Sequence, residues 1–295
     1  MLAYRHAFHA GNPADVLKHV VLLRCLQLLL AKPKALSFVD THAGAGSYEL
    51  AERMSQRLTE YMDGVGRLWQ RDDVRAALQD EAPRGAALPP PAVLDYLRAV
   101  LAFNADGTLR RAPGSPALAA HLLRASDPMQ LFELHPADCR ALQALLGSRR
   151  HTTVHPGDGF AGLRAVLPPP SRRALVLIDP PYELDADYSR VLSGLREALE
   201  RFATGVYLVW YPHLQSLASR GLGRRLRALA PAGWLEAQLW TAAPRADGFG
   251  LMGSSMFVLN PPFGLDEALR AAGPWLAEAL GRDGAGRFVL DAHLP

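Results

Sequence analysis

One stretch near the middle of the chain constrains the fold more than any other. Residues 174–178, ALVLI, form a short apolar run typical of a fully buried strand in a parallel sheet. The strand must end at Asp179-Pro180-Pro181-Tyr182, because two consecutive prolines cannot donate to a sheet ladder. Ligands of open α/β sheets bind beyond the carboxyl ends of the strands. The sequence therefore places a carboxylate, a stiff backbone and an aromatic ring where a ligand would bind.

Expected strands and helices alternate along most of the chain, which predicts an α/β fold with a doubly wound, Rossmann-like sheet. Strands are expected at 36–40, 129–134, 152–155, 174–178, 205–211, 234–240 and 254–259, the last of them ending the sheet. Helices are expected at 13–30, 137–146, 161–167, 188–201 and 214–230. The first begins with Asn12 as the N-cap and Pro13 at its first position, and its apolar residues form adjacent stripes.

A glycine-rich turn, Thr41-His42-Ala43-Gly44-Ala45-Gly46, follows the first expected strand directly. Such a turn lets a ligand approach the backbone, and the following amides can donate to it. Two of the three glycines of the dinucleotide fingerprint are present, because position 49 is Glu. The spacing is weak evidence for NAD and better matches the looser loop of S-adenosylmethionine-binding domains, which an acidic residue such as Asp40 usually precedes.

The acidic residue that should bind ribose hydroxyls comes late. In a plain βαβ unit it follows about 20 residues after the glycine turn, but the next convincing strand ends at Glu133. We therefore predict a helical subdomain inserted at 50–112, lying over the glycine loop, in a methyltransferase domain made of 1–49 and 113–295. The parent fold would resume where Ser115 caps a helix with Pro116 at its first position.

A second tetrapeptide, Asn260-Pro261-Pro262-Phe263, repeats the pattern of Asp179-Pro180-Pro181-Tyr182. In the favoured member, the Asp179 carboxylate and the Pro180 carbonyl can each accept a hydrogen from the exocyclic amino group of a base. Tyr182 offers a stacking face, typically worth ~1–3 kcal/mol per base. Taken alone, either could be an ordinary proline loop. We favour Asp179 because it ends the fourth strand, beside the first, and because an asparagine cannot take up a proton.

Bulk properties narrow the class of protein. With 49% hydrophobic residues the chain can bury a large core, and no stretch reaches the ~20 apolar residues that span a bilayer. Cys25 and Cys139 are solitary, so neither a disulfide framework nor a zinc site is indicated, and we expect a cytoplasmic protein. A net charge of +3 is only a mild preference for polyanionic partners.

Two basic segments are candidates for contact with a nucleic acid. The helix expected from Leu214 carries Arg220, Arg224 and Arg227 as one stripe, although a surface run of arginines is more often a solvated face. Near the N-terminus, the arm 1–11 holds Tyr4, Arg5 and His6, an aromatic residue among positive or titratable groups.

The chain resembles the bacterial 23S ribosomal RNA adenine-N6 methyltransferases that modify adenine 2030. The resemblance spans nearly the whole length and includes YRHAFHAGNPADVLKH, DTHAGAGSY, PGSP, ELHP, DGF, DPPYE and RFATGVYLVWYP, in that order. It is less distinct at 50–112 and beyond Pro262.

This resemblance implies a methyltransferase fold, S-adenosylmethionine as the methyl donor and 23S rRNA as the partner, without a metal or a membrane. It implies Asp179 as the catalytic residue and assigns cofactor binding to six positions: His19, His42, Ser115, Glu133, Asp158 and Gly159. By the same resemblance Tyr4 would meet the RNA, and the chemistry of the tetrapeptide adds Pro180 and Tyr182 as substrate-binding residues. A monomer is expected. Two other classes stay open: a guanine-N2 rRNA methyltransferase and a non-catalytic RNA-binding module.

Overall fold

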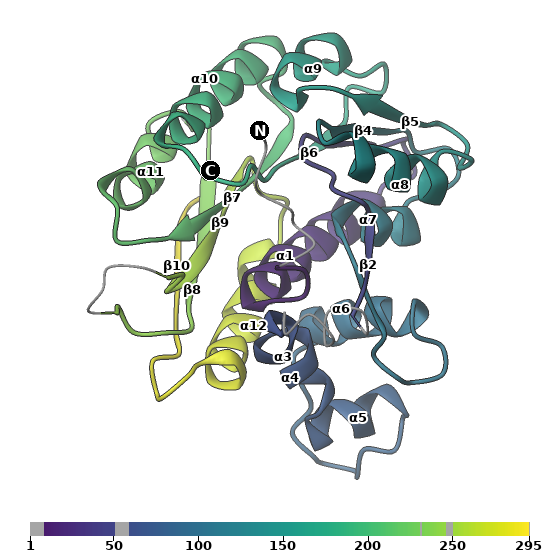
Figure 1. The fold of residues 1–295 in the computed structure, drawn as a ribbon, viewed down its shortest axis with the longest axis vertical. Helices are drawn as coiled ribbons and strands as arrows, with labels where there is room; N and C mark the ends of the chain where they lie inside the picture. The colour runs from purple at the N-terminus through teal and green to yellow at the C-terminus, as the bar shows by residue number, and fades with distance from the viewer. Residues whose placement is uncertain (1–8, 51–58, 231, 246–249, 295) are drawn as a thin grey trace.

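The computed structural model describes residues 9–50, 59–230, 232–245 and 250–294. Within these residues eight strands form one mixed sheet, in the order β10-β8-β9-β7-β6-β1-β4-β5 (Figure 1). Their bounds are β1 Ser37–Asp40, β4 Met129–Glu133, β5 Thr152–Pro156, β6 Ala174–Ile178, β7 Val206–His213, β8 Trp234–Trp240, β9 Gly253–Leu259 and β10 Arg287–His293. The doubly wound α/β fold expected from the sequence is confirmed.

Strand direction decides which of the two tetrapeptides can face a ligand. β1 pairs in parallel with β4 and β6, and β6 pairs in parallel with β7. Asp179 therefore follows the strand beside β1, at the carboxyl edge of the parallel strands, as predicted. β9 runs antiparallel to β7, with Leu259 opposite Tyr207, so Asn260 lies at the other edge of the sheet.

The two faces of the sheet bury alternate side chains of each strand. In β6, Leu175 and Leu177 join one core cluster, and Val176 and Ile178 join the other. The first face is covered by α1 Pro13–Leu30, α7 Ser115–Leu122, α8 Pro136–Leu146 and α12 Leu265–Leu280. The second is covered by α9 Gly159–Val166, α10 Asp185–Arg201 and α11 Leu217–Arg227, which form an arc in Figure 1.

Helix α1 begins as its sequence predicts and is buried more completely. The Asn12 side chain accepts a hydrogen bond from the Asp15 amide at 3.0 Å, and Pro13 opens the helix. Burial extends around the whole first half of the helix, beyond the expected apolar stripes, and includes Lys18 and His19. A helix buried all round places polar side chains inside the protein, where each must be paired.

The helices of the insertion pack against α1 and α12. Its helices are α3 Glu60–Asp63, α4 Val65–Trp69, α5 Asp72–Leu78 and α6 Pro91–Ala102, and a ribbon of β2 Ser47–Glu49 and β3 Arg111–Pro113 joins it to the sheet domain. Helices α3 and α4 are separated at Gly64, where a Cβ would lie 2.1 Å from the Gly11 carbonyl oxygen. Helix α6 contacts α1 and α12, and the position of the insertion above the glycine loop stays a prediction. The described part of the insertion shares one core cluster with α1 and the sheet, and its status as a separate subdomain stays a prediction.

The chain continues the sheet beyond the tetrapeptide at Asn260. Helix α12 returns across the first face, and β10 then pairs antiparallel with β8 at the edge. The expectation that β9 is the last strand was wrong, because the alternation in Arg287–His293 is too short and too mixed to stand out in the sequence. None of the helices in the described ranges is long and apolar enough to cross a membrane.

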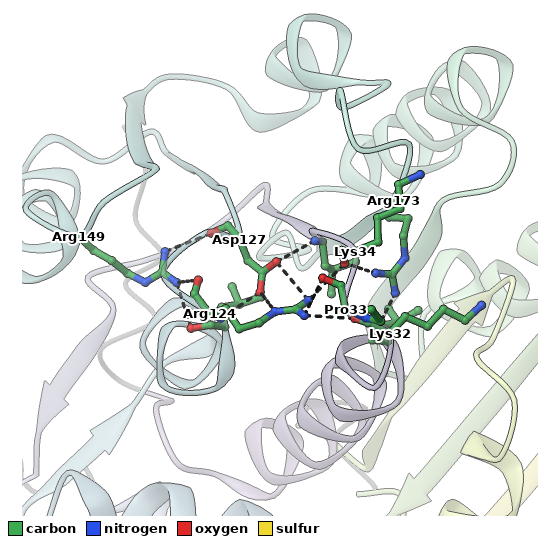
Figure 2. A network of polar contacts seen from close by, with 10 residues as sticks. Lys32, Pro33, Lys34, Arg124, Asp127, Arg149 and Arg173 are labelled. Carbon is green, nitrogen blue, oxygen red and sulfur yellow. Dashed lines mark hydrogen bonds and ion pairs between the residues drawn. The ribbon is translucent and has the colours of Figure 1, made fainter.

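At the amino edge of the parallel strands, three arginines surround Asp127 and the loop before β1 (Figure 2). Asp127 is fully buried and accepts hydrogen bonds from the Leu36 amide at 2.9 Å and from the Arg124 Nε at 2.9 Å. Arg124 and Arg173 donate to carbonyls of 29–34, and Arg149 donates to carbonyls of 123, 124, 127 and 150. The network ties together the starts of β1, β4, β5 and β6.

We expect Asp127→Ala to lower the free energy of unfolding by on the order of 3 kcal/mol, because it leaves buried donors without an acceptor. Burial alone would raise the pKa of Asp127, but hydrogen bonds from Arg124 and Leu36 outweigh it and lower that pKa. The stabilisation is thus present above the unfolded pKa of about 3.9 and is lost as the pH falls through the folded one.

Urea unfolding of wild type and variant at several pH values measures this loss. The deficit should be full at pH 7 and should narrow below about pH 4. Glu278→Ala is the matched control, because its exposed pair with Arg71 at 3.8 Å is worth well under 1 kcal/mol. Equal losses in the two variants would contradict a structural role for Asp127.

Candidate active site

A cavity of about 200 Å³ opens beyond the carboxyl ends of β1, β4, β5 and β6. Its wall includes His42, Gly44, Glu133, Asp158, Gly159, Asp179 and Pro180, which are all predicted site residues or part of the glycine loop. The wall also includes residues that were not predicted: Leu134, Asp138, Leu184, Asp187 and Arg190. The parallel strands thus bring together residues that lie far apart in the sequence.

Glu133 fixes the glycine loop to the end of β4. Its carboxylate accepts hydrogen bonds from the Gly44 amide at 2.8 Å and from the His135 amide at 2.6 Å. Gly44 has φ +61°, which favours glycine. Burial raises the pKa of Glu133. The Glu133 side chain therefore lies at the cavity as a charged hydrogen-bond acceptor, and two backbone amides fix its position.

Ser115 holds Asp40 beneath the glycine loop. The N-cap of α7 is Gly114, so the prediction that Ser115 caps this helix was wrong. Its hydroxyl donates instead to Asp40 Oδ2 at 2.6 Å, and the His42 amide donates to Asp40 Oδ1 at 3.1 Å. Burial raises the pKa of Asp40 to about 6, against the effect of these hydrogen bonds. Ser115 is not on the cavity wall and supports the loop from below.

Asp158 both caps α9 and joins an ion pair at the cavity. Its Oδ1 accepts from the Phe160 amide at 2.9 Å, and its Oδ2 accepts from Arg190 at 2.6 Å. Gly159 is needed for close packing, because a Cβ there would lie 2.1 Å from the Thr41 carbonyl oxygen. Close packing of this kind brings the ends of β1 and β5 to one ligand.

His42 lines the cavity as a neutral ring. Burial lowers its pKa to about 4, although nearby carboxylates oppose that shift. Its Nδ1 lies 2.8 Å from Thr41 Oγ1, and its ring meets Phe160 edge-on with centroids 5.2 Å apart. The ring can therefore contact a ligand without adding a positive charge.

Asp179 is held by a lysine that the sequence interpretation did not include. Lys18 Nζ lies 2.6 Å from Asp179 Oδ2 and 2.7 Å from Asp15 Oδ1. The lysine and Asp15 side chains are each 4% exposed, and that of Asp179 is 11% exposed. Burial would lower the pKa of Lys18, but the two carboxylates outweigh it and raise that pKa above its usual value. One ammonium therefore links α1 to the strand that ends in Asp179.

Several predicted site residues lie away from the cavity wall. His19 is buried on α1, its ring centroid 6.0 Å from that of Tyr96 in the insertion. Tyr182 is 6% exposed and donates its hydroxyl to the Trp210 carbonyl at 2.7 Å, so it packs in the core rather than presenting a stacking face. Tyr4 lies outside the described residues.

Residues that the sequence reasoning missed are Lys18, Asp15, Arg190, Leu134 and Leu184. For Lys18 a signal was present: it is one of three lysines in the chain and stands between apolar residues of a core helix. A buried ammonium needs a carboxylate partner, but the sequence could not say which one. The exposed Leu134 and Leu184 become site residues only through their position at the cavity mouth.

The polar groups on the cavity wall fit a ligand of the S-adenosylmethionine type. Three carboxylates, of Glu133, Asp158 and Asp179, line one cavity, where they can accept from hydroxyl and amino groups and attract a sulfonium cation. Space beside Gly157 is open, since a Cβ there would meet nothing within 4 Å. The fold and this site together define a Rossmann-like methyltransferase.

Comparison with known proteins identifies the family. Residues 33–291 match the family model described as "Ribosomal RNA large subunit methyltransferase D, RlmJ". "Ribosomal RNA large subunit methyltransferase J" of Escherichia coli K12 is 41% identical over the whole of both chains, and the protein of that name from Haemophilus influenzae is 38% identical over the whole of both. The crystal structure of protein LPL1258 from Legionella pneumophila aligns with a TM-score of 0.82 at 29% identity, covering 97% of this chain and 98% of that one. The chain belongs to this RlmJ family and is a methyltransferase that uses S-adenosylmethionine.

We expect Lys18→Met to lower the free energy of unfolding by about 3–5 kcal/mol at pH 7, because it leaves two buried carboxylates without their counter-charge. The folded variant would then bind protons more readily than the wild type. The deficit should therefore shrink as the pH falls towards 4.

Urea unfolding of the cofactor-free protein at pH 7 and pH 4 measures both effects. Lys32→Met serves as the control, since Lys32 is exposed and its side chain has no ion pair in the described residues. A Lys18→Met variant as stable as the Lys32→Met control at pH 7 would show that the ion pair contributes nothing.

Proposed function

We propose that this protein transfers a methyl group from S-adenosylmethionine to the N6 amino group of an adenine in 23S rRNA. The observation that carries the proposal is the position of the Asp179 carboxylate and Pro180 on the same cavity wall as Glu133 and Asp158. The family suggests the adenine at position 2030. We also propose that the protein acts as a monomer, and rRNA as the substrate supports a cytoplasmic location.

The cofactor would lie along the ends of β1, β4 and β5. Glu133 would accept hydrogen bonds from the ribose hydroxyls, and Asp158 would accept from the adenine amino group. His42, Gly44 and Gly159 lie on the same wall and would contact the cofactor. When bound, the cofactor supplies an electrophilic methyl group on a sulfonium. Ser115 and His19 would act indirectly, through the packing of the glycine loop and of α1.

The ion pair with Lys18 determines which oxygen of Asp179 can meet the substrate. Lys18 occupies Oδ2 at 2.6 Å, so Oδ1 is the oxygen left to accept a hydrogen from the substrate amino group. That contact, with a second to the Pro180 carbonyl, would orient the nitrogen towards the methyl carbon. Transfer would form the N–CH3 bond as the S–CH3 bond breaks and its electron pair stays on the sulfur. The methylated nitrogen would be strongly acidic, and Asp179 would take its proton. Lys18, with its raised pKa, stays charged throughout and does not compete for that proton.

The target adenine must leave any stack to reach this site, at a cost of a few kcal/mol. Tyr182, the predicted stacking residue, is enclosed by Tyr188 and Trp210, with ring centroids 4.7 and 5.9 Å away. Its role in the proposed reaction is therefore to hold the backbone of the tetrapeptide, where it adopts φ +52°. The exposed Leu184 lies at the mouth and is better placed to contact the base.

For the cofactor we expect Glu133→Ala to weaken S-adenosylmethionine binding by ~1.5–3 kcal/mol, the usual value for a hydrogen bond to a charged group. Isothermal titration calorimetry measures the change. Glu133→Gln keeps one acceptor and should lose less. Unchanged affinity in a folded Glu133→Ala variant would remove Glu133 from the cofactor site.

For the chemical step we expect Asp179→Asn to reduce turnover by a factor on the order of 10² or more, with cofactor affinity preserved, since the charge that takes the proton is lost. Methyl transfer to an unmodified 23S rRNA transcript, followed by mapping of the modified base, is the assay. A methyl group mapped to a guanine would replace the proposal with the N2 alternative.

Asn260→Ala, in the second tetrapeptide, is the matched control for Asp179→Asn. The Asn260 amide donates to the carbonyls of Ala203 at 2.8 Å and Gly205 at 2.7 Å, at the edge of the sheet opposite the cavity. This variant should lose some stability and keep its turnover. Reversed outcomes for Asp179 and Asn260 would contradict the assignment of the catalytic residue.

A further inference from the structure

A groove runs beside α11 on the second face of the sheet. This helix is the last of the arc in Figure 1, and the outward side chains of β8 and β10 beyond it are mostly exposed or half-exposed. The groove holds a cavity of about 430 Å³. Helix α11 supplies Arg220, Gly223 and Arg224 to its wall, and the strands supply His213, Gln238 and Trp240. A Cβ on Gly223 would lie 2.6 Å from Tyr211 Oη, so the helix sits as close to the sheet as its backbone allows.

The charges in this groove are not balanced. Arg227 pairs with Glu236 at 2.6 Å and with Asp291 at 2.8 Å, so its single positive charge is shared between two carboxylates. The cavity wall itself carries three arginines and one carboxylate, that of Glu236. The predicted stripe of three arginines is therefore broken, because Arg227 is held by the protein itself. Arg220 and Arg224 are exposed and form no side-chain ion pair or hydrogen bond with any residue in the described ranges. A cavity lined by such arginines favours an anionic ligand.

The floor of the groove includes two neighbouring aromatic rings, those of His213 and Trp240, which are tilted by 36° to each other. Trp240 lies between His213, with centroids 4.3 Å apart, and the Arg287 guanidinium, 4.0 Å from the indole centroid. His213 Nε2 lies 2.7 Å from Ser255 Oγ, and burial lowers its pKa to about 4, so the ring is neutral near pH 7. The exposed Arg287 and the half-exposed Gln238 add hydrogen-bond donors along the rim.

The groove opens at the same edge of the sheet as the catalytic cavity. Three strand spacings separate β6 from β8, a distance of about 14 Å, which a few nucleotides can span. The wall of the catalytic cavity carries Glu183, Asp187 and Asp138 in addition to its three carboxylates, against one arginine, Arg190. This excess of negative charge disfavours a polyanion, so we expect affinity for RNA to come from a neighbouring surface.

We propose that the groove between α11 and β8 binds the single-stranded RNA next to the target adenine, with Arg220 and Arg224 contacting its phosphates. This inference rests on the proposed function, because it names the surface that holds the same RNA. Bidentate guanidinium contacts suit phosphate oxygens, and Trp240, on the wall of the groove, is an aromatic surface that a base can contact. In this proposal the groove supplies affinity for the RNA and positions the strand relative to the cavity, and Asp179 accepts the proton in the methyl-transfer step.

The test compares Arg220→Ala/Arg224→Ala with Arg196→Ala/Arg270→Ala, a control pair of exposed helical arginines outside the groove. The probe is an unmodified 23S rRNA transcript, with binding measured over a range of salt concentrations. We expect the groove variant to bind RNA at least tenfold more weakly at low salt. Its slope of log K against log salt should fall by about 1.4, or 0.7 for each phosphate contact on a single strand.

Two further readouts separate this role from a structural one. In the groove variant the KM for RNA should rise, kcat at saturating RNA should stay within about twofold, and S-adenosylmethionine affinity should match wild type. If the wild type methylates the transcript and both double variants keep the same affinity and salt slope, the groove assignment is overturned alone. If the wild type methylates no rRNA, the proposed function and this inference are overturned together.

Discussion

The ion pairs of Lys18 are the interaction on which the catalytic half of the molecule depends. A buried ammonium is costly unless its charge is matched, and here it lies within 2.7 Å of two carboxylates from different elements. Because α1 precedes β1 and Asp179 follows β6, one contact fixes the first helix against the fourth parallel strand. Its contribution is geometric as well as energetic: it occupies one oxygen of Asp179, and in the proposed reaction the other oxygen meets the substrate.

Other polar residues of the site also hold the protein backbone in place, and some of them line the cavity as well. Glu133 and Asp158 each use one or two oxygens to hold backbone amides, and in doing so they anchor the loops that form the cavity. Asp40 and Ser115 support the same loop from below without reaching the wall. The cavity is therefore built largely before a ligand arrives, which lowers the ordering cost of binding.

Much of the fold could be predicted from the sequence because its signals are local. Prolines, glycines and apolar runs mark the ends of β6 and the start of α1 without reference to distant residues. Contacts between distant segments leave no such mark. The partner of Lys18, the enclosure of Tyr182 and the hydroxyl of Ser115 turned towards Asp40 depend on segments up to 161 positions apart. The same limit explains why β10 was not predicted: its seven residues form a strand by pairing with β8, and their sequence alone carries no clear strand signal.

The arginines at the amino edge of the sheet have a consequence for how the sequence can vary. Arg124 and Arg173 donate to the main-chain carbonyls of Leu29, Lys32, Pro33 and Lys34, so they recognise the path of this loop and not its side chains. Substitutions at 32 and 34 would leave every one of these bonds in place, whereas the arginines have no substitute of equal reach. In a saturation-mutagenesis map this corner would show a few intolerant positions beside a freely variable loop, even though all of them belong to one network.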